Sequence, residues 1–436
     1  MKSTVLVSLV SEQTVPNYLS FKTFCEADAY FFITTQRMED PVKGNRRKWL
    51  IKAANIWEDQ STMILVNPEI REDVLEKLSQ IPWQEKFSRI IVNITGGTKM
   101  MSLATWEFFH PITSEIWYLP INSNDYHLVC DSNVKKTVTY HMSVDEYLAC
   151  CGISRAANQF REKPPLFDQK TNDALFTQLI DFEQSHRPVE LIRLLFRDDN
   201  APLKNQIDKR ISAEKLKKIA QATGKLHPEL SKKKSGIDLK DAKILAAFQA
   251  KMDCLDEVMP ESKRTKLKEI SSFDFIFDFF DKIGLPYEVK DLLLKDQVNY
   301  VTGGWFEEYT YYLLKRISGQ PDSHFKLGVV LDSNRDSYFT SNDLDVVMVY
   351  NNNLYVIECK SGGMEENELF NKTVYLQAAL RKYFGLSVRS VLMTLSATSD
   401  LQKKKAETLG ILLIDRAVIL DPQANELIGS ILRIIK

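Results

Sequence analysis

The stretch that decides the C-terminal fold is Leu344-Asp345-Val346-Val347-Met348-Val349-Tyr350-Asn351-Asn352-Asn353-Leu354-Tyr355-Val356-Ile357-Glu358-Cys359-Lys360. Two apolar, β-branched runs flank three asparagines, and asparagine tolerates the positive φ angles of tight hairpin turns. The pattern therefore predicts two antiparallel strands joined by a short turn. Three charged residues interrupt the apolar runs, where an unpaired charge is costly. They are Asp345, Glu358 and Lys360.

The length of the turn determines whether these charges meet. A two-residue loop of Asn352 and Asn353 would place Asp345 opposite Lys360 and diagonal to Glu358, on one face of the hairpin. A three-residue loop would send Asp345 to the other face, because strand side chains alternate. A shared site therefore predicts an even loop, or a bulge that restores the parity.

Such a cluster suits a metal-dependent phosphodiesterase site. The carboxylates of Asp345 and Glu358, with the backbone carbonyl of Cys359, would offer hard oxygen ligands to Mg²⁺ or Mn²⁺. The ion could polarise a phosphodiester and activate a water, while Lys360 positions that water or stabilises developing charge. The alternative is a structural ion pair between Asp345 and Lys360 beside an exposed Glu358.

The order of elements around the hairpin supports the site. A helix beginning at Gly303-Gly304-Trp305-Phe306-Glu307 precedes it, and a helix over 366–384 follows it. This order resembles the restriction-endonuclease-like PD-(D/E)xK nucleases, although leucine stands at the proline position of the motif name. The resemblance implies that Glu307 joins the site; a solvated first-turn glutamate is the alternative. On the later helix Gln377 and Arg381 could touch substrate phosphate, but surface placement is expected for both.

The first 150 residues have the pattern of a parallel α/β sheet. Short β-branched runs alternate with helical segments, and the turn at 122–125 joins the last two runs as a hairpin. The expected strands are Thr4–Val10, Ala29–Thr34, Thr62–Val66, Arg89–Ile94, Glu115–Leu119 and Tyr126–Cys130.

A glycine turn, Thr95-Gly96-Gly97-Thr98-Lys99, follows the fourth of these strands and leads into a helix over 100–109. Such a turn presents backbone N–H groups and a helix N-terminus to an anion. It matches neither the dinucleotide-binding nor the Walker A pattern, and it lies too late in the domain for a dinucleotide coenzyme. A tight turn that simply needs two glycines is the alternative.

The N-terminal region resembles a CARF domain, the Rossmann-like sensor of cyclic oligoadenylates in type III CRISPR systems. The resemblance rests on Val7–Asn17, on Phe32–Thr35 and on Asn93–Ser102. It implies a homodimer with the ligand, expected to be cyclic tetra-adenylate, on its two-fold axis. The residues implied to line the pocket are Ser11, Glu12, Gln13, Thr95, Gly96, Gly97, Thr98, Lys99 and Met100.

We therefore expect a CARF domain (1–150), a helical middle region (151–295) and a nuclease domain (296–436). Proteins that coat nucleic acid non-specifically are usually basic, so with a net charge of −1 any nucleic-acid contact is expected to be local. Without a cleavable leader or a long apolar stretch, the chain is expected to be cytoplasmic.

The hypothesis is a homodimeric endonuclease of antiviral defence that a cyclic oligoadenylate activates and that cleaves single-stranded DNA or RNA, or nicks DNA. One alternative is an ungated DNA-processing nuclease. The other is a nucleotide-responsive, DNA-binding regulator with an inactive nuclease fold.

Overall fold

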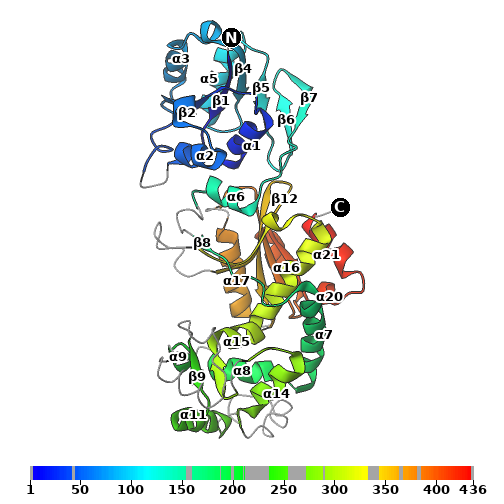
Figure 1. Cartoon of the computed structure of the whole chain (residues 1–436). Helices are drawn as coiled ribbons and strands as arrows, with labels where there is room; N and C mark the ends of the chain where they lie inside the picture. The colour runs from blue at the N-terminus through cyan, green and yellow to red at the C-terminus, as the bar shows by residue number, and fades with distance from the viewer. Residues whose placement is uncertain are drawn as a thin grey trace. The chain divides into compact units, whose positions relative to one another are not determined.

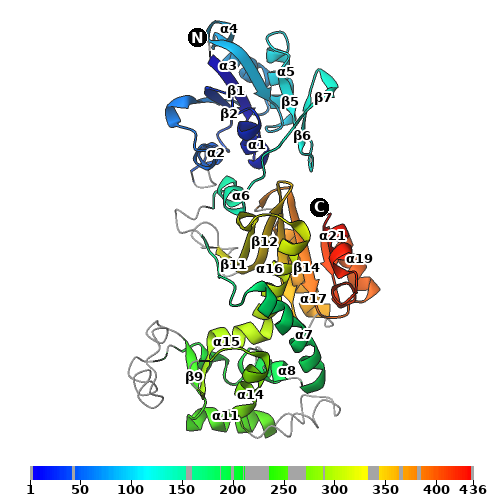
Figure 2. The same cartoon turned by 45° about the vertical axis from the view of Figure 1, so that its right-hand side comes forward.

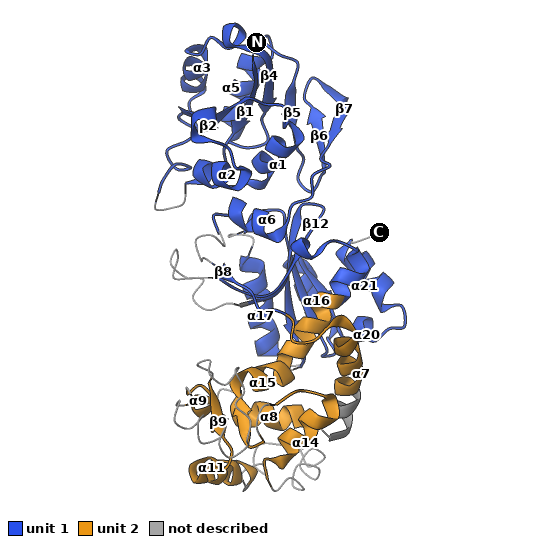
Figure 3. Ribbon diagram, in the orientation of Figure 1, with its two compact units in different colours: residues 1–164, 313–436 blue, residues 165–312 orange. Residues whose placement is uncertain are grey.

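The computed structural model describes residues 3–41, 45–153, 160–186, 188–197, 201–209, 211, 235–253, 272–287, 290–331, 343–362, 367–380 and 384–433. Two compact units divide the chain: residues 1–164 with 313–436, and residues 165–312 (Figure 3). No helix within the described ranges is long and apolar enough to cross a membrane.

The N-terminal sheet has seven strands in the order β3-β2-β1-β4-β5-β6-β7 (Figure 1). The first five are mutually parallel, and β6 and β7 add antiparallel pairs at one edge. All six expected strands are present, including the hairpin after Tyr118, whereas β7 was not expected because its residues are mostly polar and exposed. The strands are β1 (Ser3–Leu9), β2 (Ala29–Thr34), β3 (Ser61–Leu65), β4 (Phe87–Asn93), β5 (Ile116–Tyr118), β6 (Asp125–Leu128) and β7 (Asp131–Thr137).

Both faces of this sheet are covered, as its apolar strands predict. Along β1, Val5, Val7 and Leu9 enter one hydrophobic cluster, and Leu6 enters another on the opposite side. The sheet is therefore doubly wound, the Rossmann-like arrangement expected. The helices of this region are α1 (Val15–Thr23), α2 (Arg46–Ala54), α3 (Arg71–Ser79), α4 (Trp83–Lys86), α5 (Lys99–Phe109) and α6 (Val144–Cys150).

The second large sheet has the strand order β15-β14-β13-β12-β11-β8. The hairpin strands β12 (Asp343–Tyr350) and β13 (Asn353–Lys360) lie at its centre, and helices α17, α19 and α21 contact its β14–β15 side (Figure 2). The short strand β8 was not expected. The other elements are β8 (Phe160–Arg161), β11 (Phe325–Leu331), β14 (Val388–Thr394), β15 (Ile411–Ile414), α17 (Asn367–Ala379), α19 (Asp400–Thr408), α20 (Arg416–Ile419) and α21 (Ala424–Leu432).

The middle unit is mostly helical, as expected. The sequence over 237–255, rich in lysine, leucine and alanine, predicts a helix that begins at Ile237, and its start is wrong. Ile237 pairs with Leu293 in a small antiparallel sheet, and the helix starts only at Ala242. A buried two-stranded pairing overrides the helical composition here. Its elements are α7 (Gln169–His186), α8 (Pro188–Phe196), α9 (Lys204–Ile207), β9 (Gly236–Asp238), α11 (Ala242–Asp253), α14 (Asp274–Ile283), β10 (Leu292–Leu294), α15 (Lys295–Asn299) and the start of α16 (Trp305–Ser318).

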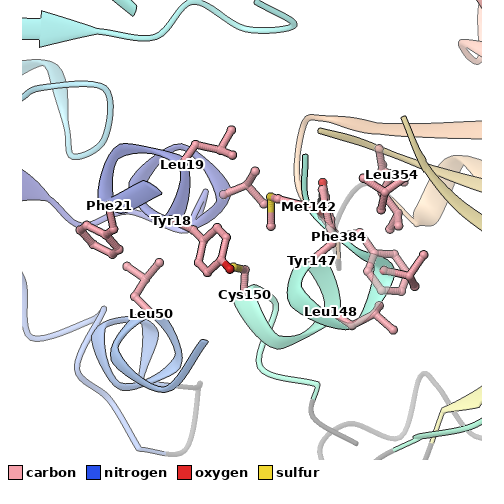
Figure 4. Packing of buried hydrophobic residues seen from close by; sticks show 14 of the residues in the cluster. Tyr18, Leu19, Phe21, Leu50, Met142, Tyr147, Leu148, Cys150, Leu354 and Phe384 are labelled. Atoms are coloured by element: carbon pink, nitrogen blue, oxygen red, sulfur yellow. Dashed lines mark hydrogen bonds between the residues drawn. The ribbon is translucent and has the colours of Figure 1, made fainter. Parts of the chain in front are cut away.

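Helix α6 packs between the two large sheets of the first unit. One hydrophobic cluster runs from Tyr18 and Leu50 of the N-terminal region through Leu148 of α6 to Leu354 and Phe384 of the C-terminal region (Figure 4). A capping box fixes the start of α6, where the Ser143 and Glu146 side chains each bond the other's backbone N–H. The two regions thus share a continuous core.

Candidate functional site

The hairpin turn has the predicted parity but not the predicted position. Tyr350 pairs with Asn353, so the loop consists of Asn351 and Asn352, both with positive φ (48° and 57°). This is the geometry of a type I′ turn. The prediction of a loop at Asn352-Asn353 is wrong by one residue.

The new register changes which charged residues face each other. In this register Val346 pairs with Ile357. The next residues along the two strands are Asp345 and Glu358, so Asp345 lies opposite Glu358 and not opposite Lys360. All three charged side chains still share one face, as an even loop requires. The backbone N–H of Cys359 donates to the Asp345 carboxylate at 2.7 Å, which holds that carboxylate against β13.

Lys360 forms an ion pair with Glu358. Burial alone would lower the pKa of Lys360, but the negative charges of Glu358 and Asp345 and the hydrogen bond to Glu358 outweigh it and raise the pKa above its usual value. The lysine therefore carries a positive charge at neutral pH. In that form it can stabilise an anion or orient a water.

A second bond orients the glutamate from α17. The Gln377 side-chain amide donates to Glu358 at 3.3 Å, and Gln377 is only 4% exposed. The expected surface placement of Gln377 is therefore wrong: the residue is buried, and its amide bonds the partly buried Glu358 carboxylate. Arg381 lies outside the described residues.

The donor set fits a hard divalent cation by its chemistry. Asp345 and Glu358 offer carboxylate oxygens on one face, and a backbone carbonyl such as that of Cys359 is a ligand type that Mg²⁺ and Mn²⁺ accept. Within the described ranges no three Asp, Glu, His or Cys side chains come together as a ready cation site. A metal here would therefore rest on two carboxylates, backbone oxygens and water.

The two glutamates at the start of α16 differ in their surroundings. Glu307 is half-buried, whereas Glu308 is 1% exposed and accepts a hydrogen bond from the Phe167 backbone N–H at 2.7 Å. Burial raises the pKa of Glu308. Both glutamates belong to the unit of residues 165–312. The bond from Phe167 gives Glu308 a structural role within that unit. A catalytic role for Glu307 stays a prediction.

The glycine turn after β4 lies directly against the end of β1. A Cβ on Gly96 would lie 2.2 Å from the Leu9 carbonyl oxygen, and Gly97 has a φ of +76°. Both glycines are therefore required by geometry. Thr98 then caps α5, because its hydroxyl accepts from the Met101 N–H at 3.2 Å.

A cavity of about 560 Å³ opens beside this turn. Its volume falls within the roughly 300–1,000 Å³ typical of small-molecule sites. Of the residues implied by the CARF resemblance, six line it: Ser11, Glu12, Gln13, Thr95, Gly97 and Thr98. Gly96 packs against the backbone of Leu9, and Lys99 and Met100 lie exposed on the first turn of α5.

Sequence reasoning missed several residues of this cavity. Arg37 lines it and forms an ion pair with Glu12, and Tyr118 lines it from the end of β5. More unexpectedly, Asn351 and Leu386 of the C-terminal region also line it. A charged residue after the second strand was a usable signal for Arg37, but nothing local could have indicated Asn351.

Comparison with known proteins identifies both ends of the chain. Residues 5–147 match the family model "Card1 CARF domain", and residues 294–420 match the "Card1-like, endonuclease domain". The chain is thus an endonuclease-type protein with a CARF domain at its N-terminal end. Both domains are the ones that the sequence resemblance predicted.

Two solved structures share this fold over nearly the whole chain. Can2 from Sulfobacillus thermosulfidooxidans, in complex with cyclic tetra-adenylate, is 19% identical with a TM-score of 0.63, covering 98% of this chain and 99% of that one. Protein VC1899 from Vibrio cholerae is 16% identical with a TM-score of 0.62, covering 99% of each chain. No curated protein matches this sequence.

Proposed function

We propose that this protein is a metal-dependent endonuclease that cyclic tetra-adenylate activates, and that it acts in type III CRISPR antiviral defence. The observation that carries the proposal is the pair of sites on one compact unit. A carboxylate–lysine cluster lies on the β12–β13 hairpin, and a cavity beside the CARF glycine turn includes the other end of that hairpin. The Can2 complex with cyclic tetra-adenylate supports the choice of ligand.

In the proposed reaction Asp345 and Glu358 would hold Mn²⁺ or Mg²⁺, with the Cys359 carbonyl as a further ligand. Bound there, the ion would supply Lewis acidity toward the scissile phosphate and lower the pKa of a water. Lys360, kept charged by its carboxylate neighbours, would stabilise the negative charge that develops on the phosphate. Gln377 would hold the Glu358 carboxylate in place through its amide. Glu307 remains the proposed contribution of α16.

Backbone N–H groups are the natural partners of the ligand's phosphates. Gly97 and Thr98, which lead into α5, line the cavity and would offer such groups, and Arg37, paired with Glu12, lines it as well. The cavity would hold only part of a tetranucleotide ring, so a second copy of the chain is needed to complete the site. This is the arrangement of an isologous dimer.

The outer face of α5 supports such a dimer. Met100, Leu103 and Trp106 follow one another at helical spacing and are 39%, 63% and 37% exposed. This apolar stripe lies on α5, the helix that begins directly after the cavity residue Thr98. We propose a second copy of this chain as its occupant, with the two-fold axis beside both cavities.

The nuclease assignment is tested by incubating the full chain and cyclic tetra-adenylate with labelled single-stranded DNA and RNA. Cleavage is expected with Mn²⁺ or Mg²⁺ and is expected to stop when EDTA removes the metal. Sedimentation of the same preparation should give the mass of a dimer. Cleavage that persists in EDTA would exclude a metal-dependent site, and a monomer that binds the ring fully would exclude the shared pocket.

A further inference from the structure

The cavity beside the CARF glycine turn is not made by the sensor alone. Its wall includes Asn351, Asn352 and Asn353, the turn of the nuclease hairpin, and Leu386 and Ser387 from the segment before β14. The hairpin that carries Asp345 and Glu358 therefore reaches the cavity with its turn. A ligand in this cavity meets both domains.

Specific bonds fix the turn in that wall. The Asn352 side chain accepts from the Met142 N–H at 2.9 Å and donates to the Tyr140 carbonyl at 3.0 Å, and Asn352 is 5% exposed. Gln13, a residue of the sensor loop, accepts from the Leu386 N–H at 2.8 Å. These bonds hold the nuclease segments at the edge of the cavity, so their presence there is part of the fold.

Asn351 differs from its neighbours. The Asn352 amide is satisfied by the sensor, and the Asn353 amide donates to the Asn351 carbonyl at 2.8 Å. The Asn351 side chain is exposed at the cavity wall, and no described residue hydrogen-bonds its amide. A side-chain amide carries one acceptor and two donor hydrogens, which complement the N6 and N7 edge of adenine.

We infer that Asn351 is a ligand-binding residue contributed by the nuclease domain, and that it reads an adenine of the bound ring. This inference rests on the proposed function, because it assumes an adenylate in the cavity. Its consequence is mechanical. From Tyr350 the strand β12 leads to Asp345, and from Asn353 the strand β13 leads to Glu358, so a ligand bound to Asn351 would touch the turn that joins the two catalytic strands.

The test compares Asn351→Gly with Asn55→Gly. Both asparagines have left-handed backbone (φ 48° and 54°), which glycine adopts without strain, so each variant removes only the side chain. Asn55 ends α2 and lies outside the cavity. Calorimetric titration with cyclic tetra-adenylate should show roughly fivefold to tenfold weaker binding for Asn351→Gly, the worth of one or two hydrogen bonds, and no change for Asn55→Gly.

The outcomes separate the inference from the function on which it rests. If the wild-type chain binds the ring and Asn351→Gly binds it with equal affinity, the inference is overturned and the proposed function stands. A wild-type chain that does not bind the ring would overturn both. Asn351→Asp provides the check against misfolding, because it keeps the turn and the shape but removes the donors; it should also weaken binding.

Discussion

Replacing Glu358 with glutamine is expected to lower ligand-activated cleavage on the order of a thousandfold while leaving the protein folded. Glutamine keeps the shape of the side chain and can still accept from Lys360, so packing around β13 is preserved. It removes the negative charge that would hold the metal and that pairs with Lys360. Single-turnover cleavage of labelled single-stranded DNA at saturating Mn²⁺ and cyclic tetra-adenylate measures the loss.

Glu407→Gln is the matched control for this variant. Glu407 is an exposed residue of α19 in the same domain, and its replacement should leave cleavage unchanged. Thermal unfolding of both variants checks that the fold survives. A Glu358→Gln protein that cleaves within tenfold of wild type would remove Glu358 from the catalytic site.

Gly96→Ala is expected to have the largest effect on the sensor. The new Cβ would lie 2.2 Å from the Leu9 carbonyl oxygen and 3.3 Å from the Ser11 hydroxyl oxygen. Since the Leu9 oxygen also accepts from the Asn17 amide at 2.8 Å, the glycine turn must move away from β1. The move would separate Ser11 from Gly97, two walls of the cavity.

We expect cyclic tetra-adenylate to bind this variant at least tenfold more weakly, with a loss of about 1–3 kcal/mol in the free energy of unfolding. Titration calorimetry and denaturant unfolding measure the two effects. Gly303→Ala is the control, because a Cβ on Gly303 meets nothing within 4 Å. If Gly96→Ala bound the ring as tightly as Gly303→Ala, the glycine turn would not be part of the ligand site.

The hairpin and the even length of its loop could be predicted from the sequence, but the exact position of the turn could not. Asn351, Asn352 and Asn353 tolerate positive φ equally, so either adjacent pair could form the loop. The choice comes from tertiary structure, because the Asn352 amide bonds Tyr140 and Met142. That one-residue difference is why Asp345 faces Glu358 and not Lys360.

The missed parts of the site share one physical cause. Gln377 was expected at the surface because a polar residue on a helix usually is, but its amide bonds the partly buried Glu358 carboxylate, a contact that no local pattern indicates. The nuclease residues of the cavity are distant in sequence from the glycine turn, and no local pattern reports such contacts. Local strands and turns were predictable, whereas contacts between residues distant in the sequence were not.

The central claim is that binding of the ring raises the activity of the nuclease. The direct measurement is the rate of single-stranded DNA cleavage by the full chain at fixed Mn²⁺, without and with saturating cyclic tetra-adenylate. The account predicts an increase of roughly tenfold to a hundredfold, the range of ordinary allosteric coupling between two sites. Equal rates in the two conditions would contradict it and would favour an ungated nuclease.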